Sequence, residues 1–313
     1  MPAPTDLHAR GLDPVAVHAV LRRLALADEP PWLHAEVARR MAEKLSLILL
    51  QPDTVVDWWS ALGGGSALLA RAYPKAQRVV VEPGPTWLQR SRARERRPWW
   101  SSRPWQAREA RVVDESQPDA EIAQGAGLVW SNMMLHGVLD PARLFERWHA
   151  LLQVDGFVMF SCLGPGTLRE LRALYQALGW CSPTPTFVDM HDLGDMLVQA
   201  GFADPVMDQE TLTLRWSSPA DLLAELRQLG GNAAPARHPG LRTPRWRHRL
   251  ERELQTLSAA DGSVGLSFEV AYGHAFKAAP RVRAGQTATV SLQEMRDKVR
   301  SPRGTAGNSR TLR

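Results

Sequence analysis

Apolar and polar positions alternate along this chain in the pattern of a parallel sheet with helices between its strands. Short apolar runs, each followed by glycine or polar residues, predict buried strands. These runs lie at residues 54–59, 78–83, 111–113, 127–131 and 157–162, the last after a predicted turn at 154–156. Parallel neighbours need long crossover connections, so the alternation predicts an α/β fold.

Between and around these runs, apolar residues recur at helical spacing. Val37, Met41 and Leu45 share one face of a predicted helix, for example, and Gly201 is placed to end another. The predicted helices cover residues 12–48, 66–72, 141–152, 165–178 and 189–200. We therefore expect each strand to be separated from the next by a helix that covers one face of the sheet.

The C-terminal half predicts a closing antiparallel hairpin, with strands at 205–216 and 265–276 and two helices, 219–229 and 244–257, inserted between them. The expected fold class is thus α/β: a Rossmann-like, seven-stranded doubly wound sheet with a helical insertion (219–258) before the last strand. The expected domains are an N-terminal helical segment (1–48), the sheet domain (49–280) and a polar, basic tail (281–313) with too few apolar residues to fold.

A formal net charge of +5 and a pI near 9.7 suggest an acidic partner. No zinc-finger spacing or other nucleic-acid-binding module is recognisable, so we expect no nucleic acid, and an acidic protein or a plainly solvated arginine-rich surface explains the charge. Cys162 and Cys181 lack metal-ligand spacing, so no metal is expected. Without a long apolar run or a signal peptide, we expect a cytoplasmic protein that does not bind membranes.

Candidate chemistry lies directly after the strands, because open parallel sheets bind ligands at the carboxyl ends of their strands. Asp57 and the glycines Gly63, Gly64 and Gly65 follow the first strand, and Glu82 ends the second. Glycines let a backbone approach a ligand closely, and an acid at this distance downstream is suited to ribose hydroxyls. A simple turn into a helix remains the alternative.

The third and fourth strands add three candidates. Asp114 ends the third strand, where an acid can accept a hydrogen bond from an adenine amino group, although a solvated loop acid explains it equally. Ser131 and Asn132 follow the fourth strand directly, which is more polarity than a plain loop requires. His136 lies just beyond them as a possible base or a structural imidazole.

Four segments of the chain have a distinctive sequence: WSNMMLH (130–136), GFVMFSCLGPGTLREL (156–171), FVDMHDLGDMLVQAGFADPVMD (187–208) and DLLAELRQLGGNAA (221–234). They resemble the corresponding segments of the malonyl-acyl-carrier-protein O-methyltransferases of biotin synthesis, a family of class I S-adenosylmethionine-dependent methyltransferases. Within the resemblance, which covers about residues 50 to 276, Asp57 and Glu82 match the first acid of the family's glycine-rich loop and its ribose acid.

The resemblance implies S-adenosyl-L-methionine as the cofactor and an acidic acyl carrier protein, carrying a malonyl group, as the partner. Methylation of a carboxylate needs no catalytic base, so we expect a cation to hold the carboxylate, with Arg169 or Arg172 as candidates. Arginines of the insertion are expected to face the carrier: Arg237, Arg242, Arg245, Arg247, Arg249 and Arg252.

The first loop departs from the family pattern D-x-G-x-G-x-G. Trp59 and Ala61 replace its first two glycines, and Gly63 matches the third. Three alternatives therefore stay open: a methyltransferase of different specificity, a non-enzymatic homologue with a degenerate cofactor loop, and a dinucleotide oxidoreductase, which suits Glu82 but lacks G-x-G-x-x-G.

Overall fold

The computed structural model describes residues 11–95, 110–116, 122 and 125–279. The tail predicted at 281–313 lies outside the described residues. The described residues up to Ala279 belong to one compact unit, so the N-terminal helices pack with the sheet. Within the described part of the chain, no helix has the length and apolar content needed to cross a membrane.

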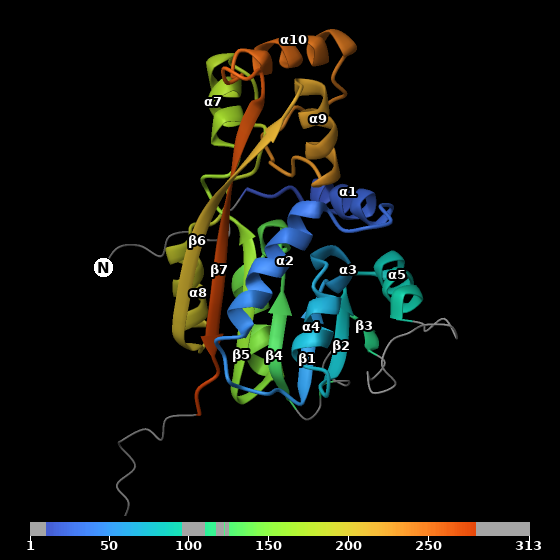
Figure 1. The fold of residues 1–313 in the computed structure, drawn as a ribbon, viewed down its shortest axis with the longest axis vertical. Helices are drawn as coiled ribbons and strands as arrows, with labels where there is room; N and C mark the ends of the chain where they lie inside the picture. The colour runs from blue at the N-terminus through green and yellow to red at the C-terminus, as the bar shows by residue number, and fades with distance from the viewer. Residues whose placement is uncertain (1–10, 96–109, 117–121, 123–124, 280–313) are drawn as a thin grey trace, which may run out of the picture. The chain divides into compact units, whose positions relative to one another are not determined.

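The sheet has seven strands in the order β3-β2-β1-β4-β5-β7-β6 (Figure 1). The first five are parallel, and β7 runs antiparallel to both β5 and β6. The strands are β1 Thr54–Trp58, β2 Gln77–Glu82, β3 Arg111–Asp114, β4 Ala126–Ser131, β5 Leu152–Leu163, β6 Ala203–Trp216 and β7 Val264–Phe276. This topology confirms the predicted doubly wound sheet and its closing antiparallel hairpin.

The predicted turn at 154–156 is wrong, because β5 continues through it as an irregular strand. The pairing of β4 with β5 shifts register between Ala126 and Leu128, and Asp155 has a positive φ of 64°. A Cβ at Gly156 would lie 2.8 Å from the carbonyl oxygen of Ala126. The Asp-Gly pair therefore serves a β-bulge rather than a reversal of the chain.

Short polar N-caps start several helices where the sequence predicts them. Asp13, Asp140, Ser218 and Thr243 each accept a hydrogen bond from the first turn of a helix and precede a proline. The helices are α1 Pro14–Ala25, α2 Trp32–Leu45, α3 Ser60–Gly63, α4 Ser66–Ala72, α5 Pro85–Glu95, α6 Pro141–Leu151, α7 Arg169–Ala177, α8 Met190–Gln199, α9 Pro219–Gln228 and α10 Pro244–Gln255, with a 3₁₀ turn η3 at Leu135–Gly137.

Successive strand residues point to opposite faces and build two apolar layers. Val55 and Leu128 pack on the face covered by α2, which crosses the front of the sheet in Figure 1. Their neighbours Val56 and Val129 pack on the other face, with Trp148 of α6. This alternation is the period of two that any strand imposes on its side chains.

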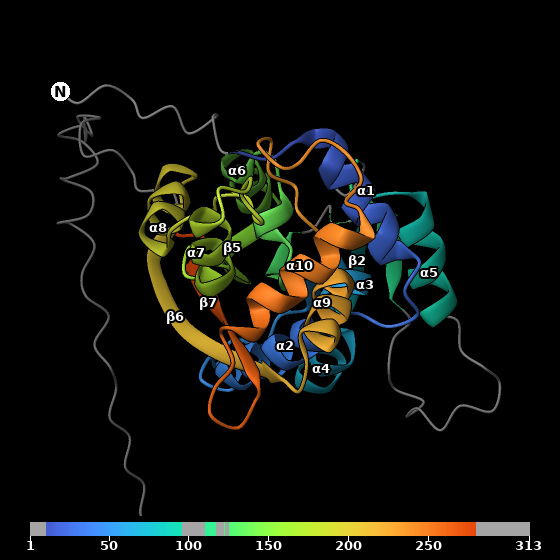
Figure 2. The ribbon, with the colours of Figure 1, turned by 90° about the horizontal axis from the view of Figure 1, so that it is seen from above.

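The hairpin of β6 and β7 extends past the carboxyl ends of the other strands and carries α9 and α10 (Figure 1). Seen from above, α7, α9 and α10 lie over the carboxyl edge of the sheet (Figure 2). The strand pairing continues out to Trp216 and Val264, which fixes where the insertion begins and ends. The insertion therefore forms a roof above the edge where the candidate residues lie.

Candidate functional site

The strand order reverses between β1 and β4, which pair in parallel although β2 and β3 lie between them along the chain. Trp58 pairs with Ser131 there, and Glu82 pairs with Asp114 on the outer side. Open doubly wound sheets bind ligands at such a switch point. The sheet thus brings the predicted residues to one edge.

The loop after β1 turns sharply at Trp59. Trp59 adopts a left-handed conformation with φ 55°, and its N–H donates to the carbonyl oxygen of Val81 at 2.7 Å. The short helix α3 follows at once. A left-handed conformation costs a non-glycine residue about 1–2 kcal/mol and costs glycine almost nothing. The loop therefore keeps a conformation that suits the glycine of the family pattern, although a tryptophan occupies the position.

The Trp59 indole is a wall of the site and is only 6% exposed. Its Nε1–H donates to Glu115 Oε2 at 3.0 Å, and the Nε1–H of Trp58 donates to Glu115 Oε1 at 3.2 Å. Burial raises the pKa of Glu115, against the two indole hydrogen bonds that lower it. One carboxylate thus holds both indoles beneath the end of β3.

Packing against neighbours accounts for all three consecutive glycines. A Cβ at Gly63 would lie 3.2 Å from the carbonyl oxygen of Asn132, and one at Gly65 would lie 2.7 Å from Nε1 of Trp130. Gly64 has a φ of +71° and faces Pro30. These glycines therefore let the loop pack closely on the protein, whether or not they also approach a cofactor.

Glu82 has the clearest features of a ligand-binding residue. Its side chain is fully buried, and Oε1 accepts hydrogen bonds from the Ala61 N–H at 2.8 Å and the Ser91 hydroxyl at 2.6 Å. Its Oε2 is buried with no partner in the described part of the chain. Burial raises the pKa of Glu82 to about 8. A buried acceptor of this kind fits a ligand hydroxyl, as the predicted ribose role requires.

Asp57 lies deeper, 1% exposed, and accepts a hydrogen bond from the Ser60 hydroxyl at 2.5 Å. Burial raises its pKa to about 6. Asp114 accepts hydrogen bonds from the backbone N–H and the hydroxyl of Ser116, so one of its carboxylate oxygens is used within the loop that follows β3. The neighbouring Glu115, which faces a cleft described below, is the acid that the third strand presents.

Ser131 and Asn132 are buried at the end of β4. Asn132 Nδ2 donates to the carbonyl oxygens of His34 and Gly63, and Asn132 Oδ1 accepts from the Ser161 hydroxyl. Every polar end of Asn132 is therefore used within the protein. Ser131 Oγ, in contrast, is buried without a partner among the described residues.

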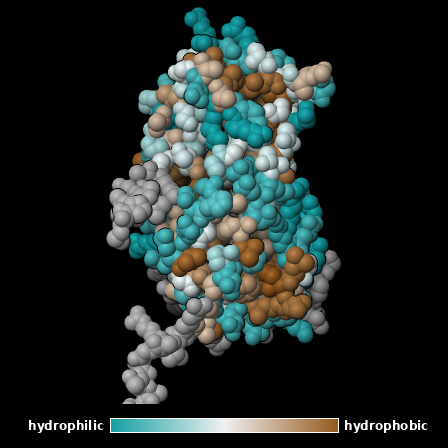
Figure 3. Space-filling view, turned by 90° about the vertical axis from the view of Figure 1, so that its left-hand side faces the viewer, coloured by the Kyte–Doolittle hydropathy of each residue, from teal (hydrophilic) through white to brown (hydrophobic). Residues whose placement is uncertain are grey.

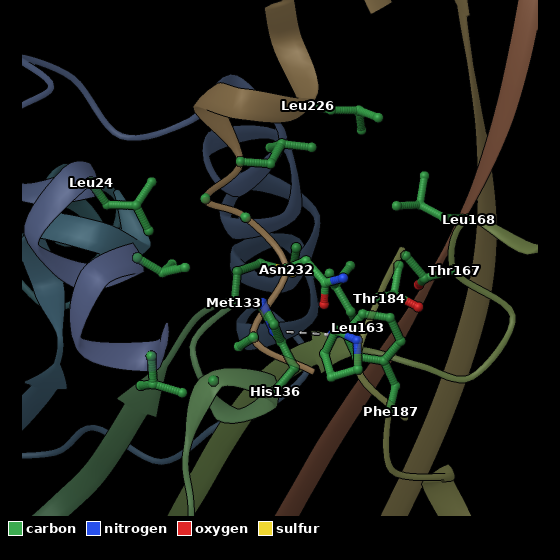
Figure 4. A pocket seen from close by; sticks show the side chains of 18 of the residues that line it. Leu24, Met133, His136, Leu163, Thr167, Leu168, Thr184, Phe187, Leu226 and Asn232 are labelled. Atoms are coloured by element: carbon green, nitrogen blue, oxygen red, sulfur yellow. Dashed lines mark hydrogen bonds between the residues drawn. The ribbon is translucent and has the colours of Figure 1, made fainter. Parts of the chain in front are cut away.

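An apolar cavity of about 300 Å³ lies between the carboxyl edge and the roof (Figure 4). A separate outer cleft is lined by residues after β2, β3 and β4, among them Pro83, Glu115 and Val138. Trp59 lines both. The indole thus stands between the apolar cavity and the outer cleft.

The structure places Arg169 and Arg172 outside the walls of this cavity. Arg169 is an exposed residue paired with Glu170 at 3.1 Å, and Arg172 donates to the carbonyl oxygen of Pro165. The arginines among the residues that line the cavity are instead Arg23 of α1 and Arg227 of α9, both of them exposed. The sequence analysis did not identify either residue, because α1 and α9 are far apart in the chain and only the folded insertion brings them to the same cavity.

Two imidazoles also line the apolar cavity. His34 is 3% exposed, and its Nδ1 lies 3.0 Å from the carbonyl oxygen of Leu62, while His136 lies in η3. Burial lowers the pKa of His34 to about 4 and that of His136 to about 3. The position of His34 on the buried face of α2, one turn before Val37 and Ala38, was the available signal in the sequence.

No model of a known protein family matches the chain. Curated relatives match it over most of its length. The malonyl-(acyl-carrier protein) O-methyltransferase of Gallionella capsiferriformans is 38% identical over 264 residues, covering 84% of this chain and 90% of the relative. The protein of the same name from Laribacter hongkongensis is 36% identical, with 84% and 88% covered. This chain belongs to the malonyl-(acyl-carrier protein) O-methyltransferase family.

Among solved structures, the YcgJ protein of Bacillus subtilis aligns with a TM-score of 0.50 at 9% identity, covering 77% of this chain and 99% of the other. At that identity the likeness shows the fold alone. Together with the strand order, it confirms the predicted Rossmann-like, seven-stranded doubly wound fold. The family resemblance drawn from the four sequence segments is confirmed as well.

Replacing Trp59 with glycine tests whether the indole is core. We expect Trp59→Gly to lower the free energy of unfolding by about 3 kcal/mol, because the lost packing outweighs the relief of the left-handed backbone. Affinity for S-adenosylmethionine should not rise. Urea unfolding and calorimetric titration measure the two quantities, with Trp59→Phe as the variant that keeps an aromatic ring but loses the indole N–H. A folded Trp59→Gly protein that gains cofactor affinity would show that the indole fills the cofactor site.

Glu82→Gln tests the buried carboxyl through pH. The folded pKa of Glu82, about 8, lies above the ordinary value of 4.5, so folded protein binds a proton that unfolded protein releases between these values. Stability should therefore fall as pH rises from 5 to 9. Relative to Glu82→Gln, the parent should lose about 1–3 kcal/mol over this range. Asp53→Asn, at an exposed carboxyl, is the control and should follow the parent. Parallel curves for parent and Glu82→Gln would contradict the assignment.

Proposed function

We propose that this protein transfers the methyl group of S-adenosylmethionine to the free carboxyl of a malonyl group carried by an acyl carrier protein. The observation that carries the proposal is the apolar cavity at the carboxyl edge, with Arg23 and Arg227 among the residues that line it. An apolar interior with cationic groups suits a short acyl chain that ends in a carboxylate. The names of the relatives support the same substrate.

The residues at the ribose position fit the cofactor. When bound, S-adenosylmethionine supplies an electrophilic methyl group on a sulfonium. Glu82 would hold its ribose through the buried Oε2, which has no other partner in the described part of the chain. Glu115, which lines the outer cleft beside Pro83, is the second acid available to the nucleoside.

The protein's own residues position the substrate and exclude water. A carboxylate is already ionised near neutral pH, so the reaction requires no general base, and the roof can act by holding the reacting oxygen in line. Arg23 is braced for this role, since its Nη1 donates to the carbonyl oxygen of Gly230 at 2.6 Å. Arg227 is an exposed residue among those that line the cavity, and its side chain makes no ion pair within the described part of the chain, so it is available to bind the carboxylate.

Some arginines of the insertion make contacts within the protein, and others are exposed without a partner in the described part of the chain. Arg237 pairs with Asp13 at 2.6 Å, and Arg247 pairs with Glu251 at 2.8 Å. Arg249 lies 4.0 Å from Glu253, and Arg242 stacks over Trp246. Arg245 and Arg252 are exposed and have no partner in the described chain. The space-filling view shows hydrophilic residues around a small apolar group at this upper end (Figure 3).

Methyl transfer itself is tested with the purified full chain, S-adenosylmethionine and malonyl-loaded acyl carrier protein. Mass spectrometry of the carrier should show a gain of one methyl group. Glu82→Ala should weaken cofactor binding by about 2–3 kcal/mol, because the ribose hydroxyls lose their buried hydrogen-bond partner. Asp53→Ala is the control. A folded parent that binds cofactor and methylates only other acids has a different specificity, and one that binds no cofactor is a non-enzymatic homologue.

The surface arginines are tested by reversing their charge. Arg245→Glu with Arg252→Glu should slow association with the carrier and flatten its dependence on salt, because attraction between exposed charges is screened. Cofactor affinity should not change. Arg39→Glu with Arg71→Glu, at exposed positions of α2 and α4, lowers the net charge by the same amount and is the control. Stopped-flow association at several salt concentrations makes the measurement, and a salt-independent rate in the parent protein would refute the role.

A further inference from the structure

Two polar side chains face the apolar cavity without being fully used by the fold. His136 lies in η3, just after β4, and Thr184 lies in the segment that joins α7 to α8. Figure 4 shows both on the wall that also holds Phe187, whose ring centroid is 6.1 Å from that of His136. Neither belongs to the cofactor positions described above.

The hydrogen bond of His136 fixes its tautomer. The backbone N–H of Leu163 donates to Nδ1 of His136 at 3.4 Å, so Nδ1 carries no proton. A neutral imidazole then carries its proton on Nε2, which has no hydrogen-bond partner among the described residues. The ring therefore offers one free N–H donor at the cavity.

Thr184 offers a second donor. Its side chain is 5% exposed, and its Oγ1 is buried without a partner in the described chain. The segment around it is braced, because Ser182 Oγ donates to the carbonyl oxygen of Thr184 at 2.8 Å and Asn232 Nδ2 donates to that of Ser182 at 2.7 Å. A buried hydroxyl without a partner is costly, so a ligand atom at this place would be stabilised.

The surroundings of the two donors favour a neutral acceptor. Leu163, Leu168 and Phe268 contribute apolar walls, and hydrogen bonds are stronger where water is excluded. The burial that lowers the pKa of His136 to about 3 keeps the ring uncharged near neutral pH. The other titratable or charged groups around the cavity are His34, Arg23, Arg227 and Tyr175. A carbonyl oxygen, with two lone pairs and no charge, matches two neutral donors.

We propose that His136 and Thr184 together bind the thioester carbonyl oxygen of the acyl substrate. The inference rests on the proposed function, since the malonyl group is joined to its carrier through a thioester. Both are positioning residues: they orient the acyl group so that its free carboxylate points to the methyl donor, and neither transfers a proton.

Variants that remove one donor each provide the first test. His136→Phe and Thr184→Val should each lower kcat/KM by about 3- to 10-fold, mostly through KM, as the loss of a neutral hydrogen bond predicts. His136→Gln and Thr184→Ser retain a donor and should recover activity. Thr184→Val should not lower the free energy of unfolding, because it removes a buried hydroxyl without a partner. If Thr184 were only structural, Thr184→Val would destabilise the fold.

Binding without cofactor provides the second test. Calorimetry compares two carriers, one with the malonyl thioester and one with a 2-carboxyethyl thioether, which has the same carbons and no carbonyl. The parent should bind the thioester about 3- to 10-fold more tightly. The double variant His136→Phe/Thr184→Val should bind both carriers equally.

The outcomes separate the two proposals. A parent that methylates the malonyl carrier, with variants that keep its activity and its preference for the thioester, overturns this inference alone. A parent that neither binds nor methylates the malonyl carrier overturns the proposed function, and this inference with it. A pH limb in kcat/KM that disappears in His136→Gln would assign the ring to proton transfer and would also overturn the inference.

Discussion

The side-chain amide of Asn132 holds together the three parts of the chain that meet at the switch point of the sheet. It donates to the carbonyl oxygens of His34 in α2 and Gly63 in α3, at 2.8 and 2.6 Å, and accepts from the Ser161 hydroxyl of β5 at 2.7 Å. Ser161 Oγ in turn accepts the Met133 N–H. Because all five residues of this network are buried, none of their polar groups can exchange its partner for water without a large cost in free energy. The position of η3, and with it His136, follows from this network.

The same close packing determines what the loop after β1 can do. With Gly63 held against Asn132, the left-handed turn falls at Trp59, and the indole is directed between the apolar cavity and the outer cleft. A ligand that reaches from one to the other must pass this indole, whose N–H is held by Glu115. Glu82 lies at the base of the loop, bound to Ala61 and Ser91, with one oxygen still available.

The roof is attached to the body by contacts of a different kind. Arg237 pairs with Asp13, and Arg23 donates to the carbonyl oxygen of Gly230, so α1 and the insertion close the cavity together. These groups are partly exposed, and partly exposed ion pairs contribute about 0–1 kcal/mol each. The sheet edge is therefore fixed by buried hydrogen bonds, while the roof joins the body through these partly exposed polar contacts and through a buried apolar cluster that Leu222 and Leu250 share with α2.

The sequence by itself determined most of the elements, because apolar periodicity and polar N-caps are local, although it did not predict α5 (Pro85–Glu95). The helix at 66–72 and the strand at 111–113 lie where the pattern predicts them, and Asp57 and Glu82 could be identified because a ligand site follows strand ends. The bulge at Asp155 was misread as a turn, since Asp-Gly serves both and only the pairing with β4 distinguishes them. The tertiary structure alone decided which residues meet. Glu115 binds Trp59, Asn132 binds His34, and Arg23 and Arg227 come to line the same cavity. These residues come together from distant segments, and a side chain's burial, pKa and free hydrogen-bonding capacity depend on neighbours that no local pattern specifies.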